Sequence, residues 1–299
     1  MGALRHRLKP LRHSRRSPER DFPTHGALPI LPGMKRLAPF LIALALGAAP
    51  AQSTTQDDVI TARVLPGWQM ADGHHMAALQ FDLAEGWKTY WRAPGDAGIP
   101  PVFDWTGSQN VKSVQIHWPS PVVFHNNGMQ TIGYHEALTL PVEITPIDPA
   151  QPVTLKVAVD LGVCEKICMP ASLRLQAALQ TPGAPDPGIK AALGDLPLTG
   201  AEAGLSAIRC EVTPIADGLR LTASIDLPRR GANETVAFET RDRAIWVAEA
   251  RTRRNGDTLT STTDLVAGGG APFALDRSDI TVTVLGEGRA IEIAGCPAP

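Results

Sequence analysis

Cys164 and Cys168 are the residues of this chain whose type and spacing best suit chemistry, in the segment Val163-Cys164-Glu165-Lys166-Ile167-Cys168. Cysteine thiolates exchange with disulfides and also bind soft metal ions. The two sulfurs meet only where the chain turns back, because an extended strand would hold their Cα atoms beyond the roughly 7 Å limit for a disulfide. From spacing alone, a redox pair and a small structural staple are equally favoured.

Loop length separates this pair from the other two cysteines, Cys210 and Cys296. On the chain-entropy model, a bridge closing the short loop from Cys164 to Cys168 stabilises by about 2 kcal/mol, whereas one between Cys210 and Cys296 gives about 4.6 kcal/mol. We therefore predict that the long bridge is structural and that the short one reacts. Lys166 favours a thiolate and Glu165 opposes it, so the sequence does not identify the attacking cysteine.

An export signal precedes these cysteines. From Met34 the chain has a short basic region, an apolar run over residues 37–49 and a small-x-small cleavage site that ends at Ala51. The run is shorter than the roughly 20 residues of a transmembrane helix. We expect translation to start at Met34, residues 1–33 to be an upstream extension, and the cleaved product to be periplasmic and not membrane-spanning.

Removal of residues 1–51 changes the charge. This segment holds nine basic and two acidic residues, which leaves 19 basic and 28 acidic residues and a net charge of about −9. Such an acidic protein is a poor nucleic-acid binder. All four cysteines lie in the exported part, where an oxidising compartment favours two disulfides.

Period-two alternation of apolar residues predicts an all-β fold. It is clear over residues 153–161, 173–179, 219–227, 280–284 and 291–293. Residues 181–202 are rich in Pro and Gly and read as a linker with a short helix near residues 189–193. We predict two antiparallel, immunoglobulin-like β-sandwiches, at residues 58–180 and 203–297.

Two further clusters have competing interpretations. Trp87, Tyr90 and Trp91 are more typical of a core than of a ligand surface. His74, His75 and Met76 are weak copper candidates, because imidazole and thioether groups suit copper. Incidental surface positions are favoured for them, and we expect no metal or other cofactor.

Four segments resemble the N-terminal domain of the DsbD thiol:disulfide interchange family, and the cysteine spacing matches its copper-sensitivity-suppressor (ScsB-like) branch. They are residues 86–100 (GWKTYWRAPGDAGIP), 118–121 (WPSP), 132–142 (IGYHEALTLPV) and 163–170 (VCEKICMP). Their order and spacing are similar to those of the family, and the resemblance extends over most of residues 58–180. Residues 203–297 resemble, less closely, the companion β domain of longer members.

The resemblance implies an immunoglobulin-like periplasmic domain in which Cys164 and Cys168 exchange electrons with partner proteins. It also implies a cap loop at roughly residues 124–131, which includes Phe124, His125, Asn126, Asn127 and Met129. The cap over the sulfurs is Phe124, Met129 or neither.

Full-length members carry a membrane domain and a thioredoxin-like domain after this region. We therefore expect a disulfide reductase component that depends on a separate electron donor, either a DsbD/CcdA-like membrane protein or a thioredoxin-like protein. Its substrates would be periplasmic proteins with disulfides. The alternative is a non-catalytic periplasmic copper-binding or interaction module with two structural disulfides.

Overall fold

The structure is a computed structural model that describes residues 54–126, 128–270 and 272–298. The expected export signal, its cleavage near Ala51, the start at Met34 and the extension at residues 1–33 all lie outside the described residues, as does Asn127. Within the described ranges, no helix combines the length and apolar character needed to cross a membrane.

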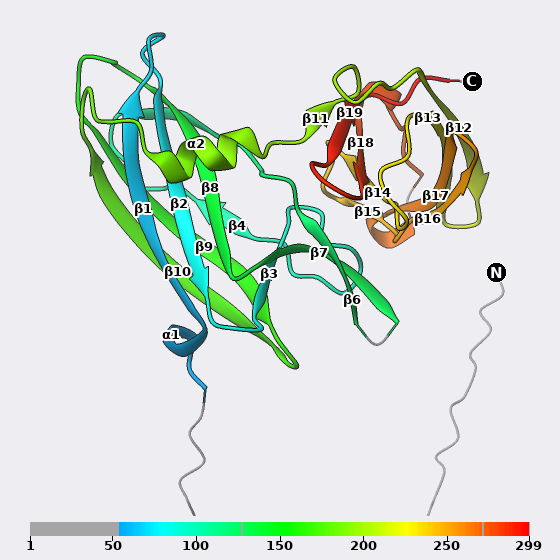
Figure 1. The fold of residues 1–299 in the computed structure, drawn as a ribbon, viewed down its shortest axis with the longest axis horizontal. Coiled ribbons are helices and arrows are strands. Elements are labelled where there is room, and N and C mark those ends of the chain that lie inside the picture. The colour runs from blue at the N-terminus through cyan, green and yellow to red at the C-terminus, as the bar shows by residue number, and fades with distance from the viewer. Residues whose placement is uncertain (1–53, 127, 271, 299) are drawn as a thin grey trace, which may run out of the picture. The chain divides into compact units, whose positions relative to one another are not determined.

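The predicted all-β fold of antiparallel immunoglobulin-like sandwiches is confirmed. In the first sandwich, one sheet has the strand order β1-β2-β8-β5, and the other has the order β10-β9-β3-β7-β6 with β4 paired to β9 (Figure 1). The elements are α1 (Gln56–Val59), β1 (Ile60–Gln69), β2 (His75–Leu83), β3 (Lys88–Tyr90), β4 (Val102–Asp104), β5 (Val111–Ile116), β6 (Val122–Asn126), β7 (Met129–His135), β8 (Ala137–Pro146), β9 (Val153–Cys164) and β10 (Cys168–Leu179).

Alternating side chains of these strands build the first core. Along β9 the odd-numbered residues from Val153 to Val163 are buried. Along β8 the buried residues are Leu138, Leu140, Val142 and Ile144. Both sets belong to one apolar cluster. Because successive side chains of a strand point to opposite faces, the even-numbered residues of β9, Cys164 included, project from the outer face of their sheet.

The second sandwich encloses the other disulfide. Its sheets have the strand orders β11-β19-β18-β14 and β12-β13-β17-β15, with β16 paired to β17. Cys210 and Cys296 are joined across a Cα–Cα distance of 5.5 Å and lie in the apolar core. The elements are β11 (Leu198–Thr199), β12 (Ala207–Ile215), β13 (Gly218–Asp226), β14 (Thr235–Thr240), β15 (Ile245–Val247), β16 (Arg251–Asn255), β17 (Thr258–Ala267), the 3-10 turns Gly268–Gly270 and Arg277–Asp279, β18 (Ile280–Leu285) and β19 (Ile291–Ala294).

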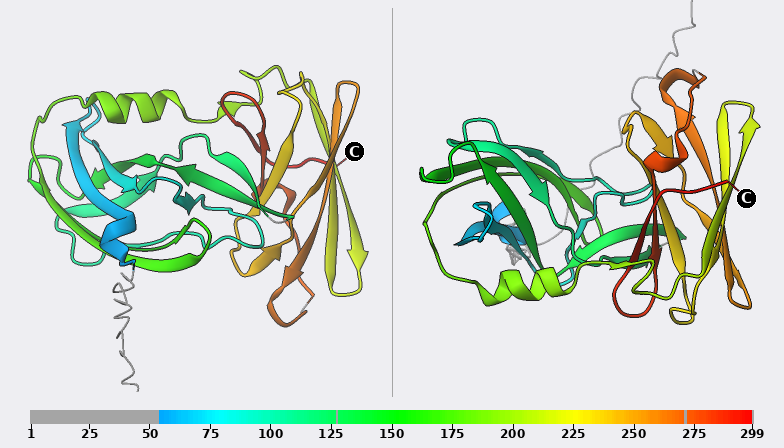
Figure 2. Two further views of the ribbon diagram at one scale, coloured as in Figure 1. Left: turned by 60° about the horizontal axis from the view of Figure 1, so that its bottom comes forward. Right: turned by 90° about the horizontal axis from the view of Figure 1, so that it is seen from above.

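The Pro- and Gly-rich stretch at residues 181–202 is more ordered than a free linker. Helix α2 (Pro187–Gly194) begins at Asp186, whose side chain accepts hydrogen bonds from the backbone N–H groups of Gly188 and Ile189. Ile189 is fully buried against Met76 and Ala78, and α2 lies along the first sandwich in Figures 1 and 2. The stretch then adds β11 to the second sandwich, parallel to β19.

Candidate functional site

The Cys164–Cys168 disulfide closes the tip of the β9–β10 hairpin. Cys164 ends β9, Cys168 begins β10, and the two residues are direct cross-strand partners with a Cα–Cα distance of 4.1 Å. The turn between them gives the reversal that the sequence argument required. Because β10 is the edge strand of its sheet and residues 165–168 are exposed, the disulfide lies at a margin that another protein can approach.

The two cysteines differ in exposure. Cys164 is 2% exposed, whereas Cys168 is exposed, as are the three turn residues between them. Next to Cys168, Ile167 is 69% exposed. A partner thiolate therefore meets Cys168 before Cys164, so the structure separates two residues that their spacing left equivalent.

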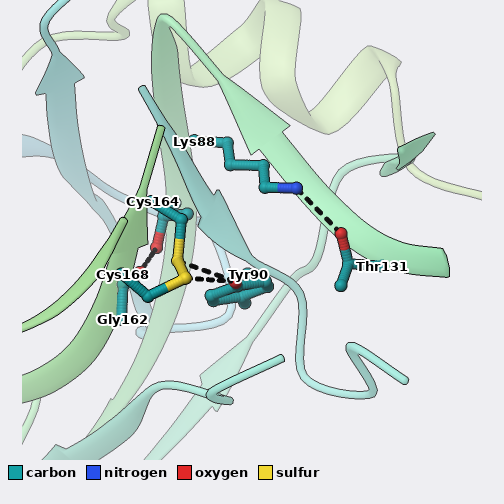
Figure 3. Close-up of a disulfide and its surroundings, with 7 residues drawn as sticks. Lys88, Tyr90, Thr131, Gly162, Cys164 and Cys168 are labelled. Atoms are coloured by element: carbon teal, nitrogen blue, oxygen red, sulfur yellow. Dashed lines mark hydrogen bonds between the residues drawn. A yellow bond between two sulfur atoms is a disulfide. The ribbon is translucent and has the colours of Figure 1, made fainter. Parts of the chain in front are cut away.

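Tyr90 contacts both sulfurs from the neighbouring strand β3. Its hydroxyl oxygen lies 2.8 Å from Cys164 Sγ and 3.4 Å from Cys168 Sγ (Figure 3). The pairing of Lys88 with Cys164 places Lys88, Tyr90 and Cys164 on the same outer face of the sheet. Burial raises the pKa of Tyr90, so the hydroxyl keeps its proton and can donate it in a hydrogen bond to sulfur.

Small residues and a loop hold Tyr90 in this position. A Cβ atom at Gly162 would lie 2.8 Å from Ile99 Cβ and 3.1 Å from the Tyr90 ring, so glycine leaves the room that both side chains occupy. On the other side of β3, a Cβ atom at Gly133 would lie 2.0 Å from the Thr89 carbonyl oxygen. The Thr89 hydroxyl donates a 3.0 Å hydrogen bond to the Gly162 carbonyl oxygen, which fixes β3 against β9.

A cationic side chain lines the hollow beside Cys164. Lys88 Nζ donates a hydrogen bond to Thr131 Oγ1 at 3.0 Å and lies 4.7 Å from the centre of the Phe124 ring. Lys88, Phe124 and Cys164 line the same hollow. Burial lowers the pKa of Lys88, and an ammonium group in this hollow favours a thiolate at Cys164.

The segment expected to be a cap loop is mostly a β hairpin. Phe124, His125 and Asn126 lie in β6, and Met129 begins β7, because the two strands pair in register from Val122 to Asn126. Phe124 and His125 line the hollow beside Cys164, whereas the Met129 side chain is 54% exposed. The packing around Gly162 and Tyr90 comes instead from residues 91–101, through Ile99.

The three copper candidates do not converge on one site. His74 Nδ1 lies 2.6 Å from Glu143 Oε1, whereas His75 Nε2 lies 2.6 Å from the Pro66 carbonyl oxygen. Met76 is buried in the apolar cluster around Ile189. Residues adjacent in sequence thus point into different surroundings and do not form a single set of ligands. His75 and Met76 are 3% and 4% exposed, which corrects the expected surface positions for these two residues.

The buried His75 predicts a specific pH dependence of stability. Burial lowers its pKa, and the hydrogen bond to Pro66 opposes this only in part. The folded-state pKa is therefore below the unfolded value of about 6.5, and the unfolded chain binds more protons between the two values. The stability that His75 contributes is fully present when the pH is above the unfolded-state pKa. It is lost as the pH falls from there towards the folded-state pKa.

We expect the His75→Gln variant, whose amide can still donate to Pro66, to lose less stability than the parent protein between about pH 7.5 and about pH 5. Urea denaturation at both pH values measures this difference. Identical losses in the two proteins would show that His75 does not titrate in the unfolding transition.

The sequence correctly assigned Trp87, Tyr90 and Trp91 to buried positions, with exposures of 8%, 2% and 0%. It missed that Tyr90 also reaches both sulfurs and that Lys88 lines the hollow beside Cys164. The available signal was their alternation in the segment Lys88-Thr89-Tyr90, which places residues 88 and 90 on one face of a strand. Which cysteine they face depends on the β3–β9 pairing, which the sequence does not display.

Comparison with known proteins supports the fold and relates the first sandwich to a known family. Residues 61–180 match the family described as "Thiol:disulfide interchange protein DsbD, N-terminal". Among solved structures, the N-terminal periplasmic domain of ScsB from Proteus mirabilis is similar, with a TM-score of 0.63 and 24% identity, over 82% of this chain and 96% of that chain. Because 82% of this chain is covered, the similar region includes more than the first sandwich. Among curated protein sequences, none matches this chain.

Proposed function

Residues 61–180 are a thiol:disulfide interchange domain of the DsbD N-terminal family, and from this premise we propose that the chain passes electrons between periplasmic proteins through Cys164 and Cys168. The observation that carries the proposal is the disulfide at the tip of an edge hairpin, with one exposed cysteine and one buried cysteine under Tyr90. A staple would need neither the exposure nor the hydroxyl.

Reduction of the disulfide proceeds in two exchanges. A thiolate of the electron donor attacks Cys168 Sγ, the S–S bond breaks, and Cys164 leaves as a thiolate that accepts a hydrogen bond from Tyr90. The donor's second thiolate then attacks the donor sulfur of the mixed disulfide and releases Cys168. The donor ends as a disulfide, and the chain gains two electrons and, after protonation, two protons.

Delivery to a substrate runs in the opposite sense. The Cys168 thiolate attacks a substrate disulfide and forms a mixed disulfide, and one substrate sulfur leaves as a thiolate. Cys164 then attacks Cys168 Sγ, re-forms the internal disulfide and releases the reduced substrate. The short Cα–Cα distance of 4.1 Å keeps Cys164 within reach for this second step.

The partners follow from the same premise. Because reduction of the Cys164–Cys168 disulfide needs a dithiol donor, we propose a separate DsbD/CcdA-like membrane protein or a thioredoxin-like protein for that role, with disulfide-containing periplasmic proteins as substrates. The basic-apolar-small pattern at residues 34–51 and the periplasmic origin of the similar ScsB domain support the location.

Tyr90→Phe is expected to raise the thiol pKa of Cys164 in the reduced protein. The variant keeps the ring but loses the hydroxyl that lies 2.8 Å from Cys164 Sγ. A hydrogen bond to a charged group contributes about 1.5–3 kcal/mol, which corresponds to about 1–2 pH units. Thiolate absorbance as a function of pH measures the shift.

Tyr134→Phe is the matched control, because the Tyr134 hydroxyl donates to the Pro119 carbonyl oxygen and not to a sulfur. An equal thiol pKa in the Tyr90→Phe variant and the parent would contradict a role for Tyr90 in stabilising the thiolate.

A redox titration tests the proposed function. The protein is equilibrated in thiol–disulfide buffers of graded potential, its free thiols are alkylated, and the two cysteine pairs are quantified separately by peptide mass spectrometry. We expect the Cys164–Cys168 midpoint to lie between about −300 and −120 mV, the range of exchange-active disulfides. The buried Cys210–Cys296 pair serves as an internal control and should stay oxidised. A Cys164–Cys168 midpoint well below about −300 mV would sink the proposal.

A further inference from the structure

Four polar side chains gather on the first sandwich around Glu143 of β8. Asp72 and His74 come from the β1–β2 turn, and His117 directly follows β5. The three segments are neighbours because β8 pairs with both β2 and β5. Apart from the neighbours Asp72 and His74, these residues are far apart in the sequence, and no sequence motif predicts that they cluster.

Three of these side chains present ligand atoms to one point. An imidazole nitrogen of His74 and carboxylate oxygens of Asp72 and Glu143 all lie within 4.8 Å of one another. His74 Nδ1 is 2.6 Å from Glu143 Oε1 and 3.9 Å from Asp72 Oδ2. One imidazole nitrogen and two carboxylate oxygens are borderline-to-hard ligands of the kind that bind zinc and neighbouring divalent metals.

The fourth side chain orients the central carboxylate. His117 Nε2 lies 2.9 Å from Glu143 Oε2, the oxygen that His74 does not contact. Outer-shell hydrogen bonds of this type fix the orientation of a ligating carboxylate and support its affinity for a metal. The His117 and Glu143 side chains are only 19% and 21% exposed, so water competes weakly for this hydrogen bond.

The turn that carries the other two ligands is itself held in shape. The His74 backbone N–H donates to Asp72 Oδ1 at 3.0 Å, which leaves Asp72 Oδ2 directed at the His74 ring. Gly73 between them has a φ of +89°, a conformation that glycine adopts readily. The His74 and Asp72 side chains are 34% and 60% exposed, so an ion can enter from solvent.

We propose that Asp72, His74 and Glu143 bind a divalent transition-metal ion, with His117 as a positioning residue that holds Glu143. Solvent molecules complete the coordination on the exposed side. The site is separate from the disulfide, because none of its residues contacts Cys164, Cys168 or Tyr90, and it does not depend on the proposed exchange function.

Isothermal titration of the disulfide-intact protein with zinc chloride tests this proposal. The oxidised form is used because free thiolates would bind zinc themselves. We expect one zinc ion per chain that is lost in both His74→Ala and Glu143→Gln. His135→Ala is the matched control, because His135 is also a surface histidine beside a carboxylate, 3.7 Å from Glu136, and we expect its variant to retain that zinc ion.

The role of His117 is tested by two substitutions. His117→Ala should weaken zinc binding by about 10–100-fold, the range for loss of an outer-shell partner. His117→Gln, whose amide can still donate to Glu143, should restore most of the affinity. Circular dichroism confirms that each variant is folded.

Three results would overturn the proposal. They are zinc binding unchanged in His74→Ala or Glu143→Gln, an equal loss in His135→Ala, and no binding by the parent protein. Equal affinities of His117→Ala and the parent would remove His117 from the site.

Discussion

Cys164→Ser is expected to leave a chain that accumulates as a mixed disulfide through Cys168, whereas Cys168→Ser should form no such adduct at a comparable rate. In the first variant the exposed cysteine still attacks a disulfide, but no second thiol is present to release the product. In the second variant the remaining thiol belongs to Cys164, which is 2% exposed and covered by Tyr90.

The difference in rate is expected to be large. Attack by Cys164 requires the hairpin tip to open, and an opening free energy of only about 1.4 kcal/mol slows the reaction about tenfold. Stopped-flow mixing of each reduced variant with a small aromatic disulfide measures the rates, and mass spectrometry identifies the adducts. The Cys210–Cys296 disulfide remains intact in both variants and makes them a matched pair.

Faster reaction of Cys164 than of Cys168 would reverse the roles proposed for the two residues. Equal rates would show that the exposure of the folded hairpin does not control access. Either result leaves the redox titration of the pair interpretable, because that experiment does not depend on which sulfur attacks.

Two long strands of the first sandwich were readable from the sequence, because their side chains alternate along most of their length. The alternation at residues 153–161 and 173–179 predicted β9 and β10, and the turn between them followed from the need for two sulfurs to meet. The predicted helix near residues 189–193 falls within α2 (Pro187–Gly194).

The rest of the site depends on strand pairing that one sequence does not display. Tyr90 read as a core residue because its apolar ring is indeed buried, but the β3–β9 register turns its hydroxyl to Cys164. The cluster of His74, His117 and Glu143 likewise needs the pairing of β8 with both β2 and β5. The alternation of side chains along a strand therefore does not show which distant strands pair or in which register, and prediction of these sites needs that information.

The structure adds detail to two local predictions. Residues 181–202 were predicted to be a linker with a short helix, and Pro187 is compatible with that helix because it occupies the first turn, where its missing N–H costs nothing. The segment expected to be a cap loop lies mostly in β6 and β7, which pair in register over residues 122–126 and 129–133. In both segments, residues that break regular structure stand at its ends.

Replacement of both Cys210 and Cys296 by alanine is expected to destabilise the second sandwich by about 4–5 kcal/mol. The two residues lie 86 positions apart, and opening a loop of this length frees much of the entropy that the disulfide removes from the unfolded chain. Alanine is chosen because both sites are buried, at 0% and 1% exposure, where an unpaired serine hydroxyl would add its own cost.

Urea denaturation followed by peptide-resolved hydrogen exchange measures the two sandwiches separately, as a chain with two cores requires. The matched control is the double alanine variant of Cys164 and Cys168, whose short loop predicts a loss of only about 2 kcal/mol, confined to the first sandwich. Since the short bridge contributes less to folding, it can open and close during exchange while the fold persists. A larger loss of unfolding free energy on replacing Cys164 and Cys168 than on replacing Cys210 and Cys296 would show that the hairpin disulfide is the more stabilising one. That result would contradict the assignment of a redox role to the short bridge and a structural role to the long one.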